Sequence, residues 1–176
     1  NQCITPNLDK LAKSGVKFNR AHTPNPVCSP ARASIMTGLL PHNHGVTTVT
    51  HTVDEDQSNL RTEKEHWAQI LKEDGYNTAY YGKWHVERTN NLEDYGWNEY
   101  QLQDGVSDEY INANKKHKDS IDESKPHLFI DNPPGYNTTP FYGVSKMDTE
   151  ERVLGLVSKK ARDFINKEKG DKPWAC

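Results

Sequence analysis

Cysteine is scarce in this sequence, which has only Cys3, Cys28 and Cys176 among its 176 residues. Three widely spaced cysteines without a C-x-x-C pair suggest neither a disulfide framework nor a zinc site. Apolar residues make up only 33% of the chain, and no run approaches the roughly 18 apolar residues of a membrane span. The net charge is −3 with both signs interspersed, so composition gives no support for nucleic-acid binding.

The sequence also lacks an initiator methionine and contains no Asp-Asp pair. Because a leader can be removed or lost, the absence of an apolar leader says nothing about targeting. Residues 172–176 have the composition of the entry to a buried strand, and a strand interrupted there indicates a fragment of a longer protein. A chain of 176 residues is still long enough for one domain with a hydrophobic core.

Apolar spacing and turn residues predict an alternation of helices and strands. Helices are expected at residues 5–15, 29–38, 62–75 and 148–169. Strands are expected at residues 16–18, 46–53, 78–81 and 127–130. The polar stretch 104–126 is expected to be an exposed loop. A helix, a turn and a strand in succession are typical of α/β proteins, whose functional loops follow the carboxyl ends of strands.

Capping residues refine three of these helices. Thr62 with Glu65, and Asp148 with Glu151, have the spacing of capping boxes. For the helix at 29–38, Ser29 is the predicted N-cap, Pro30 suits the first helical position and Gly38 closes the end.

Cys28 would then lie just outside that helix N-terminus, where free amide N–H groups favour negative charge. Arg32 lies in the first turn, where a cation has the wrong sign for the helix dipole. The pattern indicates that Arg32 pairs with an anion held beside Cys28.

A second cationic pair follows the predicted strand at 78–81. Lys83 and His85 are two residues apart, so in extended backbone their side chains project to the same side. That arrangement suits two groups that face one anion. Taken singly, each is more often a surface lysine or a hydrogen-bonded loop histidine.

These two segments carry a resemblance to a known family. Residues 28–32 read C-x-P-x-R and residues 82–85 read G-K-W-H, as in the type I sulfatases of the alkaline phosphatase superfamily. The strings at 5–12, 41–46 and 95–100 also resemble segments of that family. The resemblance implies an alkaline-phosphatase/sulfatase-like α/β sandwich, with a mixed central sheet flanked by helices. Residues 1–176 are then expected to be the N-terminal part of a sulfatase catalytic domain.

The resemblance also implies a chemistry for each motif residue. Cys28 would be oxidised to formylglycine by a maturation enzyme, and its hydrate would be the nucleophile that cleaves a sulfate ester. Arg32 would hold the hydrate and its charge. Lys83 and His85 would both bind the sulfate group, and His85 would also bond to the nucleophile or pass protons. A divalent metal, usually Ca²⁺ or otherwise Mg²⁺, would bind the formylglycine oxygen at Cys28. The substrate would be a small sulfate ester or a sulfated glycan, and the compartment periplasmic, secreted or lysosomal.

The sequence departs from the family at the metal site. The Asp-Asp pair that sulfatases carry before the segment at 5–12 is missing, and the later carboxylate ligands are expected beyond residue 176. His42 and His44 are not expected to bind metal in a Gly/Pro-bounded loop, and residues 54–56 are expected to be a solvated acidic turn. Two alternatives stay open: a phosphonate or phosphate ester hydrolase of the same superfamily, and a non-catalytic binding protein in which Cys28 remains a thiol.

Overall fold

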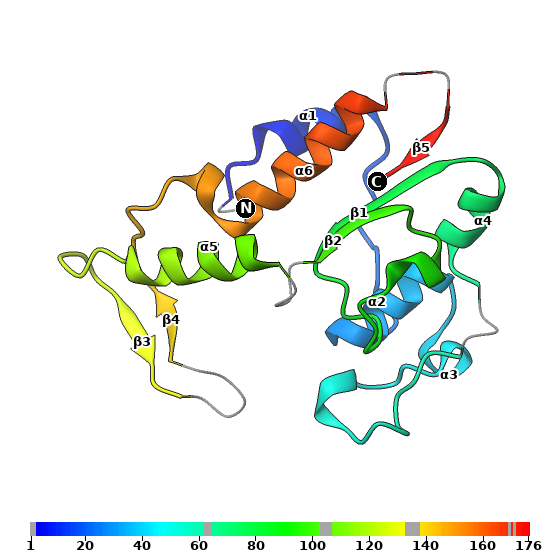
Figure 1. Cartoon of the computed structure of the whole chain (residues 1–176), viewed down its shortest axis with the longest axis horizontal. Coiled ribbons are helices and arrows are strands. Elements are labelled where there is room, and N and C mark those ends of the chain that lie inside the picture. Colours follow the sequence, from blue (N-terminus) through cyan, green and yellow to red (C-terminus); the bar gives the residue numbers. More distant parts are fainter. Residues whose placement is uncertain (1–2, 62–64, 103–106, 133–137, 169, 171) are drawn as a thin grey trace.

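The computed structural model describes residues 3–61, 65–102, 107–132, 138–168, 170 and 172–176. Its main sheet has three parallel strands in the order β2 (Glu99–Leu102), β1 (Asn77–Gly82) and β5 (Trp174–Ala175) (Figure 1). A separate antiparallel pair joins β3 (Leu128–Ile130) to β4 (Thr139–Tyr142). The α/β fold expected from the sequence is confirmed, and so are the predicted strands at 78–81 and 127–130.

Helices and short 3-10 turns connect these strands. The α-helices are α1 (Pro6–Ser14), α2 (Cys28–Thr37), α3 (Pro41–His44), α4 (Trp67–Glu73), α5 (Asp108–Asp119) and α6 (Val153–Lys167). The 3-10 turns are η1 (Thr50–Thr52), η2 (Leu92–Tyr95) and η3 (Thr149–Glu151). The predicted helix at 5–15 is confirmed as α1. In the part of the chain that is described, no helix has the length and apolar character needed to cross a membrane.

Helices cover both faces of the central strand β1. The ring of Tyr81 contacts Phe164 of α6, whereas the ring of Tyr80 contacts Trp84 and its hydroxyl lies near Arg32 of α2. Because neighbouring residues of a strand point to opposite faces, α6 and α2 lie on opposite faces of β1. Figure 1 shows α6 and α2 on different sides of the strands.

The main core lies directly under the loop that follows β1. Trp84, Trp97 and Leu92 are buried there. Burial of a large apolar side chain contributes about 2–3 kcal/mol to folding. Because Trp84 stands between Lys83 and His85 in the sequence, its burial anchors the loop that carries both polar residues.

Two predicted strands are wrong. Both apolar residues of the segment 16–18 are exposed, and no described strand pairs with it. The segment 46–53 contains η1 instead of a strand. There the hydroxyl and the backbone N–H of Thr52 both donate to the carbonyl oxygen of Val49, at 2.8 and 3.1 Å. Such local bonds compete with a strand ladder.

The helix that carries the cysteine begins earlier than predicted. Cys28 is its first residue and Val27 is the N-cap, so Ser29 lies inside α2 with a buried side chain. Gly38 ends the helix as predicted, in the left-handed conformation with φ of 70°. Its N–H donates to the carbonyl oxygen of Ser34 at 2.8 Å. Cys28 therefore belongs to the first turn, and does not precede it.

Helix α4 begins later than predicted. The expected cap, Thr62, lies outside the described residues, and the observed N-cap is His66. The backbone N–H of His66 donates to the Oε1 atom of Gln69 at 2.7 Å. The side chain of Gln69, three residues after the cap, thus plays the part expected of Glu65, four positions further along the chain.

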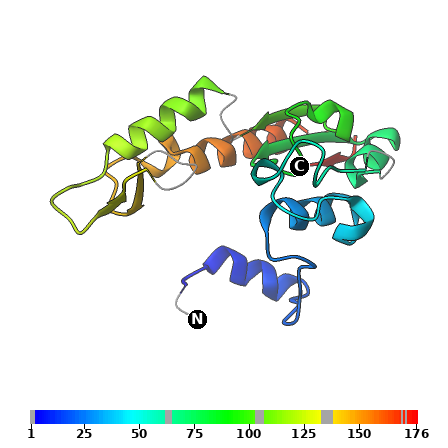
Figure 2. The same ribbon diagram turned by 90° about the horizontal axis from the view of Figure 1, so that it is seen from below.

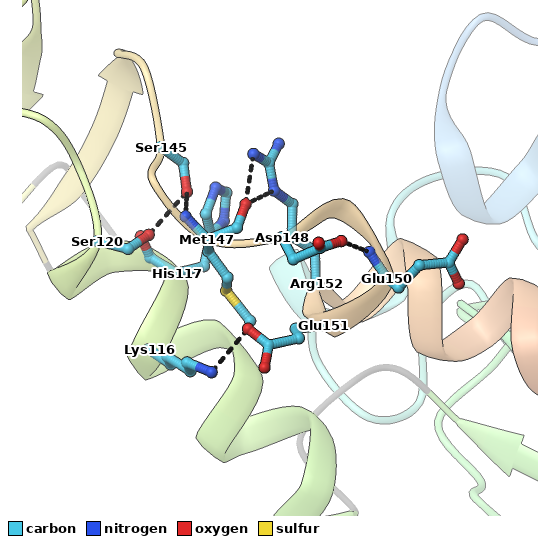
Figure 3. A network of polar contacts seen from close by, with 9 residues as sticks. All are labelled: Lys116, His117, Ser120, Ser145, Met147, Asp148, Glu150, Glu151 and Arg152. Atoms are coloured by element: carbon cyan, nitrogen blue, oxygen red, sulfur yellow. Dashed lines mark hydrogen bonds and ion pairs between the residues drawn. The ribbon is translucent and has the colours of Figure 1, made fainter.

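The polar stretch 104–126, expected to be an exposed loop, instead contains α5. Tyr110 and Ala113 are three residues apart, face the same side of the helix and are buried in a small second core with α6. An ion pair between Lys116 Nζ and Glu151 Oε2, at 2.7 Å, joins α5 to η3 (Figure 3). Both side chains are exposed, so this pair adds little stability.

The predicted helix at 148–169 consists of two elements. Asp148 caps η3, because its carboxylate accepts a hydrogen bond from the Glu150 N–H at 2.9 Å. Arg152 is extended (φ −71°, ψ 157°) and separates η3 from α6. Its guanidinium donates to the carbonyl oxygen of Met147 at 3.0 and 3.3 Å (Figure 3). The helix ends at Lys167, before the predicted end.

Candidate active site

Cys28 lies at an open cavity of about 560 Å³ at the start of α2. The cavity is also lined by Val27, Arg32 and Met36. The segment before the helix is held by a bond from the Val27 N–H to the Oδ1 atom of Asn25, at 2.9 Å. Cys28 is half-buried and its thiol is free. The position is therefore ordered by the helix and open to a reactant from the cavity.

Arg32 joins the cysteine helix to the loop after β1. Its Nη1 atom donates to the carbonyl oxygen of Lys83 at 2.6 Å. The carbonyl oxygen of Trp84 lies 3.5 Å from the same Nη1 atom. The hydroxyl of Tyr80 donates to the same Lys83 oxygen at 2.5 Å. These protein partners of Arg32 are neutral carbonyl groups. Because these partners carry no charge, they leave the positive charge of the guanidinium uncompensated.

Lys83 and His85 follow β1 at the carboxyl edge of the parallel sheet, as predicted. Both are half-buried. The backbone leaves the extended conformation at His85, whose φ is 50°. The expectation that an extended backbone aligns the two side chains therefore does not hold, although both motifs do meet through Arg32.

His51, which sequence reasoning missed, lies against His85. The His51 Nδ1 and His85 Nε2 atoms are 2.7 Å apart, and the two rings stack with centroids 4.8 Å apart. Both residues line a cleft of about 230 Å³ together with Glu87 and Leu102, the last residue of β2. The Val- and Thr-rich sequence around His51 predicted a strand, and nothing in it indicated the contact between His51 and His85.

Arg88 bridges several carbonyl oxygens of the loop that carries His51. The Nη2 atom of Arg88 donates to the carbonyl oxygens of Thr50, Asp54 and Gln57 at 2.6, 3.0 and 3.2 Å. The acidic residues 54–56 are exposed in this turn, which confirms the predicted solvated acidic turn.

His44 is buried and both of its ring nitrogens have partners. Its Nδ1 atom accepts from the Val46 N–H at 3.1 Å, so the neutral ring carries its proton on Nε2, which lies 2.9 Å from the Ser34 hydroxyl. Burial lowers the pKa of His44 and favours this neutral form. His44 is therefore held in the fold by contacts at both ring nitrogens.

The described residues do not by themselves form the metal site that the resemblance implies. Among residues 3–61, 65–102 and the later described segments, no three His, Cys, Asp or Glu side chains gather so that they could hold a metal ion. Cys28 has no carboxylate cluster beside it in this part of the chain.

Comparison with known proteins decides the family. A family model described as Sulfatase matches residues 2–175. The chain belongs to the sulfatase family. N-acetylgalactosamine-6-sulfatase of Mus musculus is 27% identical to this sulfatase-family chain over 175 residues, covering 92% of the chain and 31% of the mouse protein. The ulvan-active sulfatase of Formosa agariphila is 43% identical over 83 residues, covering 47% of the chain and 15% of that protein.

The fold is shared more widely than the sequence. The phosphonate monoester hydrolase of Agrobacterium radiobacter superposes with a TM-score of 0.67 at 20% identity, covering 97% of this sulfatase-family chain and 34% of the hydrolase. This likeness concerns the fold alone. The chain thus spans about a third or less of the length of each of these proteins.

Proposed function

We propose that the protein containing this chain hydrolyses a sulfate ester with a formylglycine nucleophile made from Cys28. The observation that carries the proposal is the bond of 2.6 Å from Arg32 to the Lys83 carbonyl oxygen, which joins the cysteine helix to the loop of Lys83 and His85. Membership of the sulfatase family supports the same reaction class.

Each motif residue receives a role from its charge and position. A formylglycine hydrate would supply one hydroxyl that attacks sulfur, so that the S–O bond to the alcohol breaks. Deprotonation of the second hydroxyl would then re-form the aldehyde and break the C–O bond to sulfate, and water would restore the hydrate. The cation of Arg32 holds the hydrate and its charge, and Lys83 binds the sulfate oxygens. His85 bonds to the nucleophile or passes its proton to the departing alcohol oxygen.

The metal is a separate part of the proposal. Ca²⁺, or Mg²⁺, would be bound by the formylglycine oxygen at residue 28 and would stabilise charge on the sulfate. The described residues lack the carboxylates for it, and no step above depends on it. We infer that residues 1–176 are the N-terminal part of a catalytic domain whose other segments supply these ligands.

The proposed substrate is a sulfated glycan or a small sulfate ester. The names of two relatives, N-acetylgalactosamine-6-sulfatase and ulvan-active sulfatase, support the glycan. A formylglycine-generating enzyme is the proposed partner in maturation, and a periplasmic, secreted or lysosomal compartment follows from the family resemblance. The second candidate is phosphonate or phosphate ester hydrolysis, because the same fold occurs in a phosphonate monoester hydrolase.

The test is made on the full-length protein co-expressed with a formylglycine-generating enzyme. We expect the peptide containing Cys28 to lose about 18 Da and to resist thiol alkylation, while Cys3 and Cys176 remain thiols. The converted protein should hydrolyse aryl sulfates faster than matched phosphate esters, and Cys28→Ala should abolish turnover. An unmodified Cys28 after efficient co-expression would count against the reaction, and a preference for phosphate esters would favour the second candidate.

A further inference from the structure

The structure pairs His85 with a second histidine that no sequence motif includes. His51 Nδ1 lies 2.7 Å from His85 Nε2, and the rings are nearly parallel, with an interplanar angle of 26°. A distance of 2.7 Å between these two ring nitrogens is within hydrogen-bond range. The two residues come from η1 and from the loop after β1, so the contact depends on the fold and not on adjacency in the chain.

The position of His51 is built into the surrounding backbone. Thr50 is buried, and its carbonyl oxygen accepts a bond of 2.6 Å from Arg88. Arg88 also donates to the Oδ1 atom of Asn59 at 2.5 Å, at the far end of the same loop. Arg88 is three residues after His85, so the segment that carries His85 also holds the loop that carries His51.

A bond between two imidazole rings constrains both of them. A neutral imidazole has one N–H donor and one acceptor nitrogen, so in this pair one ring donates and the other accepts. Whichever direction the bond takes, the protonation of His85 Nε2 is fixed by His51. The protonation state of the other ring nitrogen of His85, Nδ1, is then fixed as well, because a neutral imidazole carries a proton on only one of its two nitrogens.

We propose that His51 is a positioning residue that fixes the ring orientation and the tautomer of His85. The inference rests on the proposed function for its consequence in catalysis, since His85 is there the group that bonds to the nucleophile. A histidine that exchanges between tautomers offers the required donor or acceptor only part of the time. The bond to His51 holds one tautomer of His85, so the ring offers the required donor or acceptor all of the time.

The first test reads the histidine ring directly and does not depend on activity. Long-range ¹H–¹⁵N spectra of the full-length protein are compared for the wild type, His51→Ala and His51→Asn, with the His85 signals assigned by their loss in His85→Gln. We expect one tautomer of His85 in the wild type, averaged ring nitrogens in His51→Ala, and recovery in His51→Asn, whose amide replaces Nδ1. The control, His42→Ala, removes an exposed histidine from α3 and should leave the His85 signals unchanged. Unchanged His85 signals in His51→Ala would overturn the proposal.

The second test asks whether His51 acts through His85. In the enzyme whose Cys28 has been converted to formylglycine, His51→Ala should lower kcat for an aryl sulfate about tenfold, with little change in KM. A tenfold loss corresponds to the free energy of about one hydrogen bond. His85→Ala should lower kcat further, and the double variant should be no slower than His85→Ala alone. Losses that multiply in the double variant would show that His51 acts independently and would overturn the proposal. If the wild type hydrolyses no sulfate ester, the proposed function fails, and the spectra alone decide the role of His51.

Discussion

His66 is a buried histidine among aromatic rings, beneath the loop that carries the candidate site. It is 1% exposed, and its ring lies 4.6 Å from that of Tyr95 and 5.9 Å from that of Trp84. Neither ring nitrogen has a hydrogen-bond partner among the described residues. Desolvation by burial lowers the pKa of His66 to about 4. The folded state therefore requires the neutral ring.

This burial makes stability depend on pH in a defined direction. The pKa of His66 is lower in the folded than in the unfolded state, so its contribution to stability is complete above about pH 6.5 and is lost as the pH falls toward 4. The loss amounts to about 3 kcal/mol of unfolding free energy. His66→Phe keeps a ring in the core without the proton site and should flatten this part of the pH dependence. Denaturant unfolding at pH 7, 5.5 and 4 measures the effect.

The control for this prediction is His42→Ala, because His42 is exposed and its removal should leave the wild-type pH dependence intact. If His66→Phe and the wild type lose equal stability between pH 7 and 4, His66 is not buried as a neutral ring in solution.

At the scale of the residue, short motifs in the sequence indicated the candidate site, and sequence patterns failed where only the fold makes a contact. Cys28, Arg32 and the loop of Lys83 and His85 are found from short local strings. The joining of the two strings by a side-chain to backbone bond could not be predicted, because a carbonyl oxygen has no sequence signature. His51 was missed because its partner, His85, is 34 residues away in the sequence and no motif links the two.

Between η2 and β2, Gly96 allows a turn to pack directly on α4. Its φ is +90°, a conformation that residues with a Cβ rarely adopt. A Cβ at this position would lie 2.3 Å from the Gln69 nitrogen and 2.4 Å from the Ala68 carbonyl carbon. Both are backbone atoms, so no side-chain rotation can relieve the overlap.

Gly38 offers a matched control, because its φ is +70° and a Cβ there would meet nothing within 4 Å. Gly38→Ala should therefore cost only the backbone strain, about 1 kcal/mol of unfolding free energy. Gly96→Ala adds the overlap with α4 and should cost about 4 kcal/mol or more. Equal losses for the two variants in thermal or denaturant unfolding would mean that the turn and α4 separate readily.

Elements with a strong local pattern were predicted well, and those shaped by a neighbour were not. α1 carries a clear helical periodicity and β1 a run of strand-favouring residues, and both appear near their predicted bounds. The break at Arg152 is different, because it depends on η3 lying against α6. A Cβ on Gly155 would lie 2.3 Å from the Thr149 carbonyl oxygen, so this close approach needs the glycine. This contact could not be predicted from the sequence, because the helical pattern of apolar residues continues without a break through residues 148–169.

At the scale of the whole molecule, α1 is separated from the packed body. It has no buried residue, and Leu8 and Leu11 are 64% and 67% exposed. Figure 2 shows α1 standing apart from the sheet and from α6, joined by the segment that leads to α2. Leu8 and Leu11 form an apolar face of an amphipathic helix, and the described residues do not cover it.

The polypeptide 1–176 on its own should therefore be cut by trypsin in the linker between α1 and α2 before it is cut at Arg32 or Arg88. Lys17 and Arg20 are exposed there, in a segment without helix or strand. Arg32 and Arg88 are half-buried and bonded to backbone carbonyl oxygens, so trypsin requires local unfolding to reach them. We expect cleavage at the two linker sites at least about tenfold faster than at either arginine of the body. Limited trypsin digestion followed by mass spectrometry measures the order of the cuts.

Early cleavage at Arg32 or Arg88, at a rate like that of Lys17, would show that the body is not packed in this polypeptide. Protection of Lys17 and Arg20 would show that α1 and its linker dock on the body in solution.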